Sequence, residues 1–169
     1  MRLCIVGFGL IGASIAAALK ARTEGSVVVA IDRSAIIDTE AVRALADVRV
    51  ASDDEPGVDR ELSSADLVVL AAPVSVIAGM IERVLERARV VTDCGSTKRA
   101  IAARALGSPY RERLVLGHPL AGGSSAGADE ARADLFDGKT WIVCEQGSSE
   151  AVRASVRALV ASLGARVVA

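Results

Sequence analysis

The chain has 169 residues, of which 51% are hydrophobic, 2% aromatic and 24% charged, and its formal net charge is −1. A chain of this length can bury a core as a single domain, and its apolar content excludes a disordered or collagen-like protein. Because the charges nearly cancel and no basic stripe is present, the sequence predicts no nucleic-acid partner.

The cysteines and the single histidine argue against a disulfide framework and against a zinc site. The 3 cysteines, Cys4, Cys94 and Cys144, are widely spaced, and the chain has 1 histidine. Both kinds of site use closer, paired spacings. We therefore expect buried thiols, no metal, and a reducing, cytoplasmic location.

An uncharged stretch at residues 3–19 follows Arg2 and could pass for the hydrophobic region of a signal peptide. Gly7, Gly9 and Gly12 lie inside it and weaken a membrane or signal helix. The stretch also leads into a regular alternation of strands and helices. We expect neither a signal peptide nor a membrane span.

Short apolar runs alternate with helical patterns along the whole chain. Strands are expected at residues 2–6, 27–31, 48–51, 67–72, 89–92, 114–116, 141–143 and 166–168. Helices are expected at residues 13–22, 39–45, 76–87, 97–106 and 150–163, and a polar loop at residues 52–60. Fully apolar strands separated by helices are typical of parallel strands covered on both faces. Residues 1–169 are therefore predicted to form one α/β domain with a doubly wound, mainly parallel sheet.

A glycine-rich loop separates the first strand from the first helix. Gly7 can make the turn, Gly9 lets a pyrophosphate approach the backbone, and Gly12 lets the helix pack on the strand. Free N–H groups at the start of the helix would hold the phosphates. Glycines alone are common, but this context is typical of a Rossmann-type dinucleotide-binding fold. The predicted cofactor loop consists of Gly7, Phe8, Gly9, Leu10, Ile11 and Gly12.

Asp32 follows the second strand, twenty residues after Gly12. A carboxylate at this place accepts hydrogen bonds from the adenosine ribose and repels a 2′-phosphate, so the motif predicts NAD in preference to NADP. Arg33 leaves alternatives open, because its guanidinium could meet a 2′-phosphate, lie over the adenine or remain in solvent. Ala72 and Pro73 end a later strand and are expected at the same crevice.

A second group of polar residues follows later strands, at the edge where open α/β sheets bind ligands. His118 comes directly after an apolar strand, and Pro119 favours an extended backbone before it. Oxidation of an alcohol needs a base for the hydroxyl proton, and imidazole suits that role. His118 could equally be a structural histidine, Ser96 could cap the following helix, and Lys98 could be a surface charge.

Together these residues resemble the prephenate and arogenate dehydrogenases of tyrosine biosynthesis. The similarity covers nearly the whole chain in five successive blocks, at residues 7–14, 66–74, 92–98, 118–122 and 135–139. Asp-x-Gly-Ser-x-Lys in the third block and His-Pro-x-Ala-Gly in the fourth are far more specific than the glycine loop.

The resemblance implies NAD-dependent oxidative decarboxylation of prephenate, a small molecule, to 4-hydroxyphenylpyruvate. By that resemblance His118 would deprotonate the ring C4 hydroxyl, Ser96 would orient His118 and this hydroxyl, and hydride would pass from C4 to the nicotinamide. At residues 123–125 the chain has Gly-Ser-Ser where the family often has an acidic or larger polar residue. The choice between prephenate and arogenate therefore stays open.

The family also continues into a helical domain that forms the dimer and supplies an arginine for the substrate carboxylate. The resemblance therefore implies that residues 1–169 are the cofactor-binding domain of a longer, homodimeric protein. Two other functions remain open. The chain could belong to another Rossmann dehydrogenase or imine reductase, or it could be a non-catalytic NAD-binding module.

Overall fold

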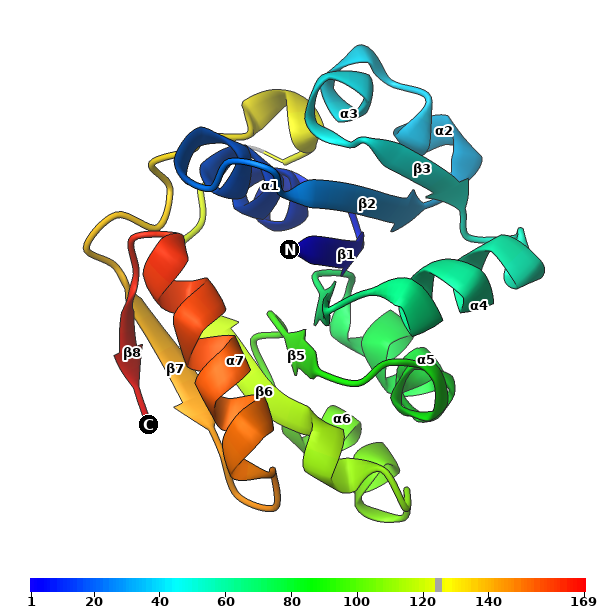
Figure 1. The fold of residues 1–169 in the computed structure, drawn as a ribbon, viewed down its shortest axis with the longest axis vertical. Coiled ribbons are helices and arrows are strands. Elements are labelled where there is room, and N and C mark those ends of the chain that lie inside the picture. Colours follow the sequence, from blue (N-terminus) through cyan, green and yellow to red (C-terminus); the bar gives the residue numbers. More distant parts are fainter. Residues whose placement is uncertain (124–125) are drawn as a thin grey trace.

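The computed structural model describes residues 1–123 and 126–169 (Figure 1). Within these residues the centre of the molecule is an eight-stranded sheet with the order β3-β2-β1-β4-β5-β6-β7-β8. The strands are β1 (Arg2–Val6), β2 (Val27–Asp32), β3 (Val48–Ala51), β4 (Leu67–Leu70), β5 (Val91–Asp93), β6 (Leu114–Pro119), β7 (Thr140–Cys144) and β8 (Arg166–Val168). The helices are α1 (Leu10–Arg22), α2 (Ser34–Ile37), α3 (Glu40–Leu45), α4 (Glu55–Ser64), α5 (Val74–Arg87), α6 (Arg99–Leu106) and α7 (Glu150–Ser162), with 3-10 turns η1 (Arg111–Arg113) and η2 (Ala128–Glu130).

The predicted α/β class and the mainly parallel sheet are confirmed. Strands β1 to β6 pair in parallel, whereas β7 runs antiparallel to β6 and places Ile142 opposite His118. Strand β1 lies between β2 and β4, so the strand order reverses at β1. In open α/β sheets this reversal opens a crevice at the carboxyl ends of the strands, and ligands bind there.

Two apolar cores lie on opposite faces of the sheet. Helices α1, α3 and α7 cover one face, where Leu3 and Ile5 of β1 point. Helices α4, α5 and α6 cover the other face, where Cys4 and Val6 point. Because alternate residues of one strand enter both cores, the strands in the middle of the sheet contain no polar alternation. Figure 1 shows α7 lying across β6 and β7.

The edge formed by β7 and β8 departs from the expectation that each strand is covered on both faces. Along β7 the buried Trp141 and Val143 alternate with exposed residues. Ile142 is 42% exposed and Val168 of β8 is 49% exposed. Among the residues that the structure describes, α7 covers one face of this edge and no helix covers the other, so the expectation of two covered faces does not hold for β7 and β8.

Residues 52–60 were expected to form a loop, and this prediction is wrong, because α4 occupies most of them. The Asp54 carboxylate accepts a hydrogen bond from the Gly57 N–H at 3.1 Å and caps the helix, while Pro56 lies in its first turn. The signal for a helix start was therefore present in the sequence. The single turn α2 was also missed.

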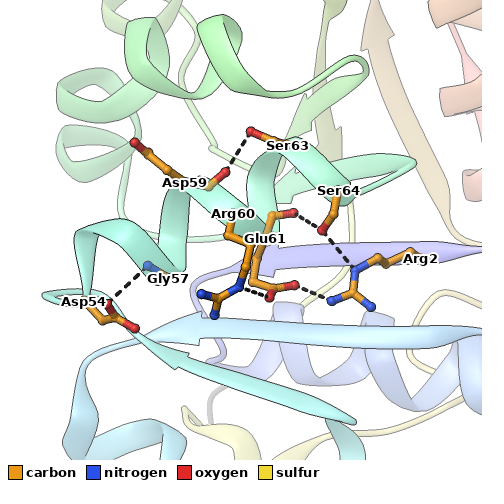
Figure 2. A network of polar contacts seen from close by, with 8 residues as sticks. All are labelled: Arg2, Asp54, Gly57, Asp59, Arg60, Glu61, Ser63 and Ser64. Carbon is orange, nitrogen blue, oxygen red and sulfur yellow. Dashed lines mark hydrogen bonds and ion pairs between the residues drawn. The ribbon is translucent and has the colours of Figure 1, made fainter.

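A network of ion pairs joins α4 to the amino end of β1, away from the crevice (Figure 2). The nearly buried Glu61 carboxylate pairs with Arg2 and with Arg60. Arg2 also donates from Nε to Ser64 Oγ at 3.2 Å. These contacts fix the first strand of the sheet against α4.

The cysteines differ in burial, and none forms a disulfide in the described structure. Cys4 is buried, Cys94 is partly buried and Cys144 is exposed, so the expectation of buried thiols is wrong for Cys144. In the part of the chain that the structure describes, no helix is long and apolar enough to cross a membrane. Within residues 1–123 and 126–169, no cluster of three or more His, Cys, Asp or Glu side chains could hold a metal ion.

Candidate functional site

The glycine loop joins β1 to α1 at the crevice. Gly7 has a φ of +92°, and a Cβ there would lie 2.5 Å from the Ala72 nitrogen. A Cβ on Gly12 would lie 2.1 Å from the Gly7 carbonyl oxygen, whereas a Cβ on Gly9 would meet no described atom within 4 Å. Gly7 and Gly12 therefore allow close packing of the backbone, and Gly9 leaves open space above the loop.

Helix α1 begins at Leu10, three residues before the predicted start. Its N-cap is Gly9, and no described side chain caps its first N–H groups. The uncapped N–H groups of a helix start carry partial positive charge and bind phosphate. This end of α1 thus fits the pyrophosphate of a dinucleotide.

Asp32 lies at the end of β2, beside the loop. Its Oδ2 accepts a hydrogen bond from the Phe8 N–H at 2.7 Å, and its Oδ1 accepts one from the Arg33 N–H at 2.7 Å. The Asp32 side chain is 18% exposed, and each carboxylate oxygen can accept a further hydrogen bond. Asp32 can therefore shape the loop and still bind ribose hydroxyls. The Arg33 guanidinium is 79% exposed, with its Nε 3.9 Å from Asp32 Oδ1.

A cavity of about 850 Å³ opens beside the loop. Of the predicted cofactor residues, it is lined by Gly7, Phe8, Gly9, Asp32, Arg33, Ala72 and Pro73. Leu10, Ile11 and Gly12 are not among the described residues that line it. Other residues that line the cavity were not predicted from the sequence, and they include Ile36, Thr39, Ser52, Val58, Val76 and Met80. The apolar side chains from α4 and α5 form a wall suited to a flat ring such as adenine. Val76 and Met80 are four residues apart on the helix that follows Pro73, so the sequence already indicated that they share one face of that helix.

His118 lies near the end of β6, on the same edge of the sheet. It is half-buried, and its Nδ1 lies 3.4 Å from the Cys94 carbonyl oxygen. A carbonyl oxygen only accepts hydrogen bonds, so this contact fits the tautomer of His118 that has its proton on Nδ1. In that tautomer the other ring nitrogen, Nε2, has a lone pair and can act as a base.

Asp93, at the end of β5, is fully buried and lies at the base of this site. Its Oδ1 accepts a hydrogen bond from the Gly117 N–H at 3.1 Å, and its Oδ2 accepts one from the Gly95 N–H at 2.9 Å. Burial raises the pKa of Asp93, and the ion pair with Lys98 opposes this rise. Lys98 is only 27% exposed and also donates to the Gly117 carbonyl. It is therefore not a surface charge.

Ser96 is exposed in the loop between β5 and α6. Helix α6 begins at Arg99 with Lys98 as its N-cap and without a side-chain cap from the described residues, so Ser96 does not cap it. No hydrogen bond joins Ser96 to His118 within residues 1–123 and 126–169. Ser124 and Ser125, at which the sequence leaves the choice between prephenate and arogenate open, lie outside the described residues.

A family model described as prephenate dehydrogenase, nucleotide-binding domain, matches residues 15–169. The chain belongs to this family. The resemblance found in the sequence motifs is thereby confirmed. Because the match begins after the glycine loop, the role of that loop in this nucleotide-binding domain rests on the geometry given above.

Prephenate dehydrogenases from two bacteria are similar to most of the chain. The enzyme of Lactococcus lactis subsp. cremoris is 30% identical over 151 residues, which are 86% of this chain and 41% of the relative. The enzyme of Bacillus subtilis is 34% identical over 146 residues, which are 82% of this chain and 38% of the relative. The chain therefore spans about two fifths of the length of these curated relatives.

Solved structures confirm the Rossmann-type fold of this prephenate dehydrogenase nucleotide-binding domain. Prephenate dehydrogenase from Aquifex aeolicus superposes with a TM-score of 0.86 at 23% identity, over 98% of this chain and 60% of that one. Arogenate dehydrogenase from Synechocystis superposes with a TM-score of 0.83 at 28% identity, over 99% of this chain and 59% of that one.

Proposed function

We propose that this chain binds NAD and supplies the cofactor site and the catalytic base of a prephenate dehydrogenase. The observation that carries the proposal is the Nδ1 contact of His118 with the Cys94 carbonyl, on the sheet edge that also holds the glycine loop. A further A. aeolicus prephenate dehydrogenase structure, in complex with hydroxyphenyl propionate and NAD+, has the same fold with a TM-score of 0.81.

Each part of the dinucleotide has a place in the crevice. The N–H groups at the start of α1 would hold the pyrophosphate above the open face of Gly9. Asp32 would accept hydrogen bonds from the adenosine ribose, and Val76 and Met80 would contact the adenine. Bound NAD would supply the hydride acceptor.

The residues of the chain then handle the proton. Nε2 of His118 would take the proton of the ring C4 hydroxyl as hydride leaves C4. Loss of the ring carboxylate as carbon dioxide would make the ring aromatic, and the resulting phenolate would take the proton back from His118. The exposed Ser96 hydroxyl would orient the substrate hydroxyl. The product would be 4-hydroxyphenylpyruvate, an intermediate of tyrosine biosynthesis.

Arogenate is a second candidate substrate, because a structure similar to this chain at 28% identity is an arogenate dehydrogenase. Arogenate differs from prephenate in the side chain and not at C4, so His118 and Ser96 would act in the same way on both. Parallel assays with prephenate and arogenate would separate the two.

The wider setting is part of the same proposal. Residues 1–169 would be the cofactor-binding domain of an enzyme of the length of its relatives, which are more than twice as long as the matched stretch. Exposed apolar side chains lie on or beside the edge formed by β7 and β8, at Leu120, Ile142 and Val168. They are consistent with a homodimer contact or with a further domain that packs on this edge. The free cysteines are consistent with the cytoplasm.

The decisive experiment is His118→Asn in the complete protein, assayed for reduced cofactor with prephenate and NAD. Turnover should fall by about 10²–10⁴-fold because the base is lost, while NAD affinity stays unchanged. Ser96→Ala should cost less, and Ser155→Ala, on the exposed side of α7, is the matched serine control. Near-normal turnover of His118→Asn would return His118 to a structural role and contradict the proposal.

A further inference from the structure

The β5–β6 ladder stops just before the candidate base. In the described structure it pairs Val91 with Leu114 and Thr92 with Val115 and extends no further. Two residues later, the Gly117 N–H donates to the Asp93 carboxylate at 3.1 Å, and the Gly117 carbonyl accepts from Lys98. Side chains thus take the place of the next bonds between the two strands.

Lys98 also forms an ion pair with Asp93, so Asp93, Lys98 and Gly117 are each in contact with the other two. Such a buried ion pair adds little net stability, since the loss of hydration offsets the attraction. Charge-assisted hydrogen bonds do impose a defined length and direction. The expected effect of the pair is therefore to fix geometry.

The geometry that it fixes is that of His118, from two sides. The backbone of His118 follows directly on Gly117, and its ring contacts the carbonyl of Cys94, which follows directly on Asp93. Gly117 permits the close approach of β5, since a Cβ there would lie 2.7 Å from the Asp93 carbonyl oxygen. A shift of Gly117 relative to Asp93 would therefore break the ring contact.

We propose that Asp93 and Lys98 are positioning residues for the candidate base. By holding Gly117, they keep Nδ1 of His118 on the Cys94 carbonyl and so keep Nε2 available as the proton acceptor. The kinetic consequence rests on the proposed function of His118, whereas the positioning itself rests only on the contacts above.

Nitrogen NMR of the imidazole tests the positioning without any assay of activity. His118 is the only histidine among residues 1–169, and a comparison with His118→Asn assigns its imidazole signals in the complete protein. At a pH where the ring is neutral, the wild type should carry its proton on Nδ1, and Lys98→Met should shift the proton towards Nε2. Lys98→Arg should restore most of the Nδ1 form. Lys20→Met is the matched control, because Lys20 pairs with Asp47 away from this site.

An unchanged Nδ1 form in Lys98→Met would overturn the proposal, and so would a wild-type spectrum with the proton on Nε2. These readings hold whether or not the protein oxidises prephenate, so a failure of the proposed function is seen separately.

Kinetics of the complete protein give the second test. Lys98→Met should lower kcat by about 10²-fold, the loss typical of a misplaced catalytic group, with the KM and affinity for NAD unchanged. Lys98→Arg should recover part of this loss. Lys20→Met should leave kcat unchanged. If kcat, NAD affinity and the thermal midpoint of Lys98→Met fall together, Lys98 has only a structural role and the proposal is wrong.

Discussion

The glycine loop and the His118 site lie on the same edge of the sheet but are built in different ways. The loop is a continuous segment of backbone whose shape depends on missing side-chain atoms at Gly7 and Gly12. The His118 site depends on side chains, because Asp93 reaches Gly117 across 24 positions of sequence. The loop should therefore fail when an atom is added, and the His118 site when a side chain is removed.

The largest effect that would sharpen this comparison is expected within the loop itself. Gly12→Ala should lower the free energy of unfolding by about 3 kcal/mol, because its Cβ would lie 2.1 Å from a backbone oxygen. Gly9→Ala should change that free energy by less than about 0.5 kcal/mol, since its Cβ meets nothing described within 4 Å. It should still weaken NAD binding, because the methyl group occupies the phosphate approach.

Urea unfolding and NAD titration of both variants measure these effects. A Gly12→Ala protein as stable as the wild type would contradict the steric argument. A Gly9→Ala protein with unchanged NAD affinity would show that the pyrophosphate does not lie over Gly9.

An intermediate effect, on cofactor affinity, is expected at Asp32. Its carboxylate is a side-chain group that contacts the glycine loop, through the Phe8 N–H. Asp32→Ala should weaken NAD binding by about 1–3 kcal/mol, because hydrogen bonds to a charged acceptor are lost. Asp32→Asn is the matched control, since its amide oxygen can still accept from the Phe8 N–H while the charge is gone. It should reduce the preference for NAD over NADP. Titration with both cofactors measures this, and equal wild-type affinities would show that Arg33 governs specificity.

The smallest effect is expected at Glu61, an ion-paired carboxylate that lies away from the crevice. Burial opposes its ionisation, but hydrogen bonds from Arg2 and Arg60 outweigh this and hold the pKa of Glu61 below its usual value. A lowered carboxyl pKa stabilises the folded state above the unfolded pKa, and this contribution is lost as the pH falls through the folded pKa. Glu61→Gln should therefore lower the free energy of unfolding by about 1–2 kcal/mol at neutral pH and by less in acid.

Urea unfolding of wild type and Glu61→Gln at neutral and acidic pH measures this difference. NAD affinity should be unchanged, in contrast to the effect of Asp32→Ala. An equal loss of stability at both pH values would show that the Glu61 charge is not responsible.

The sequence by itself determined the features that depend on neighbouring residues. Apolar runs separated by helical patterns predicted the parallel sheet, because a strand covered on both faces has no polar side. The glycine loop and Asp32 were found because a tight turn followed by a helix is a local arrangement. The motifs around Ser96 and His118 led to the family. The start of α4 was equally local, and Asp54 and Pro56 carried the signal that was missed.

Only the tertiary structure decided which side chains meet across the sheet. A lysine at position 98 is compatible with solvent or with a buried partner, and the choice depended on β5 ending beside Gly117. The exposed position of Ser96 and the bare face of Ile142 likewise depend on where α6 and α7 pack. These contacts join segments far apart in the chain, and their distances are set by the packing of whole elements, which no local pattern of residues contains.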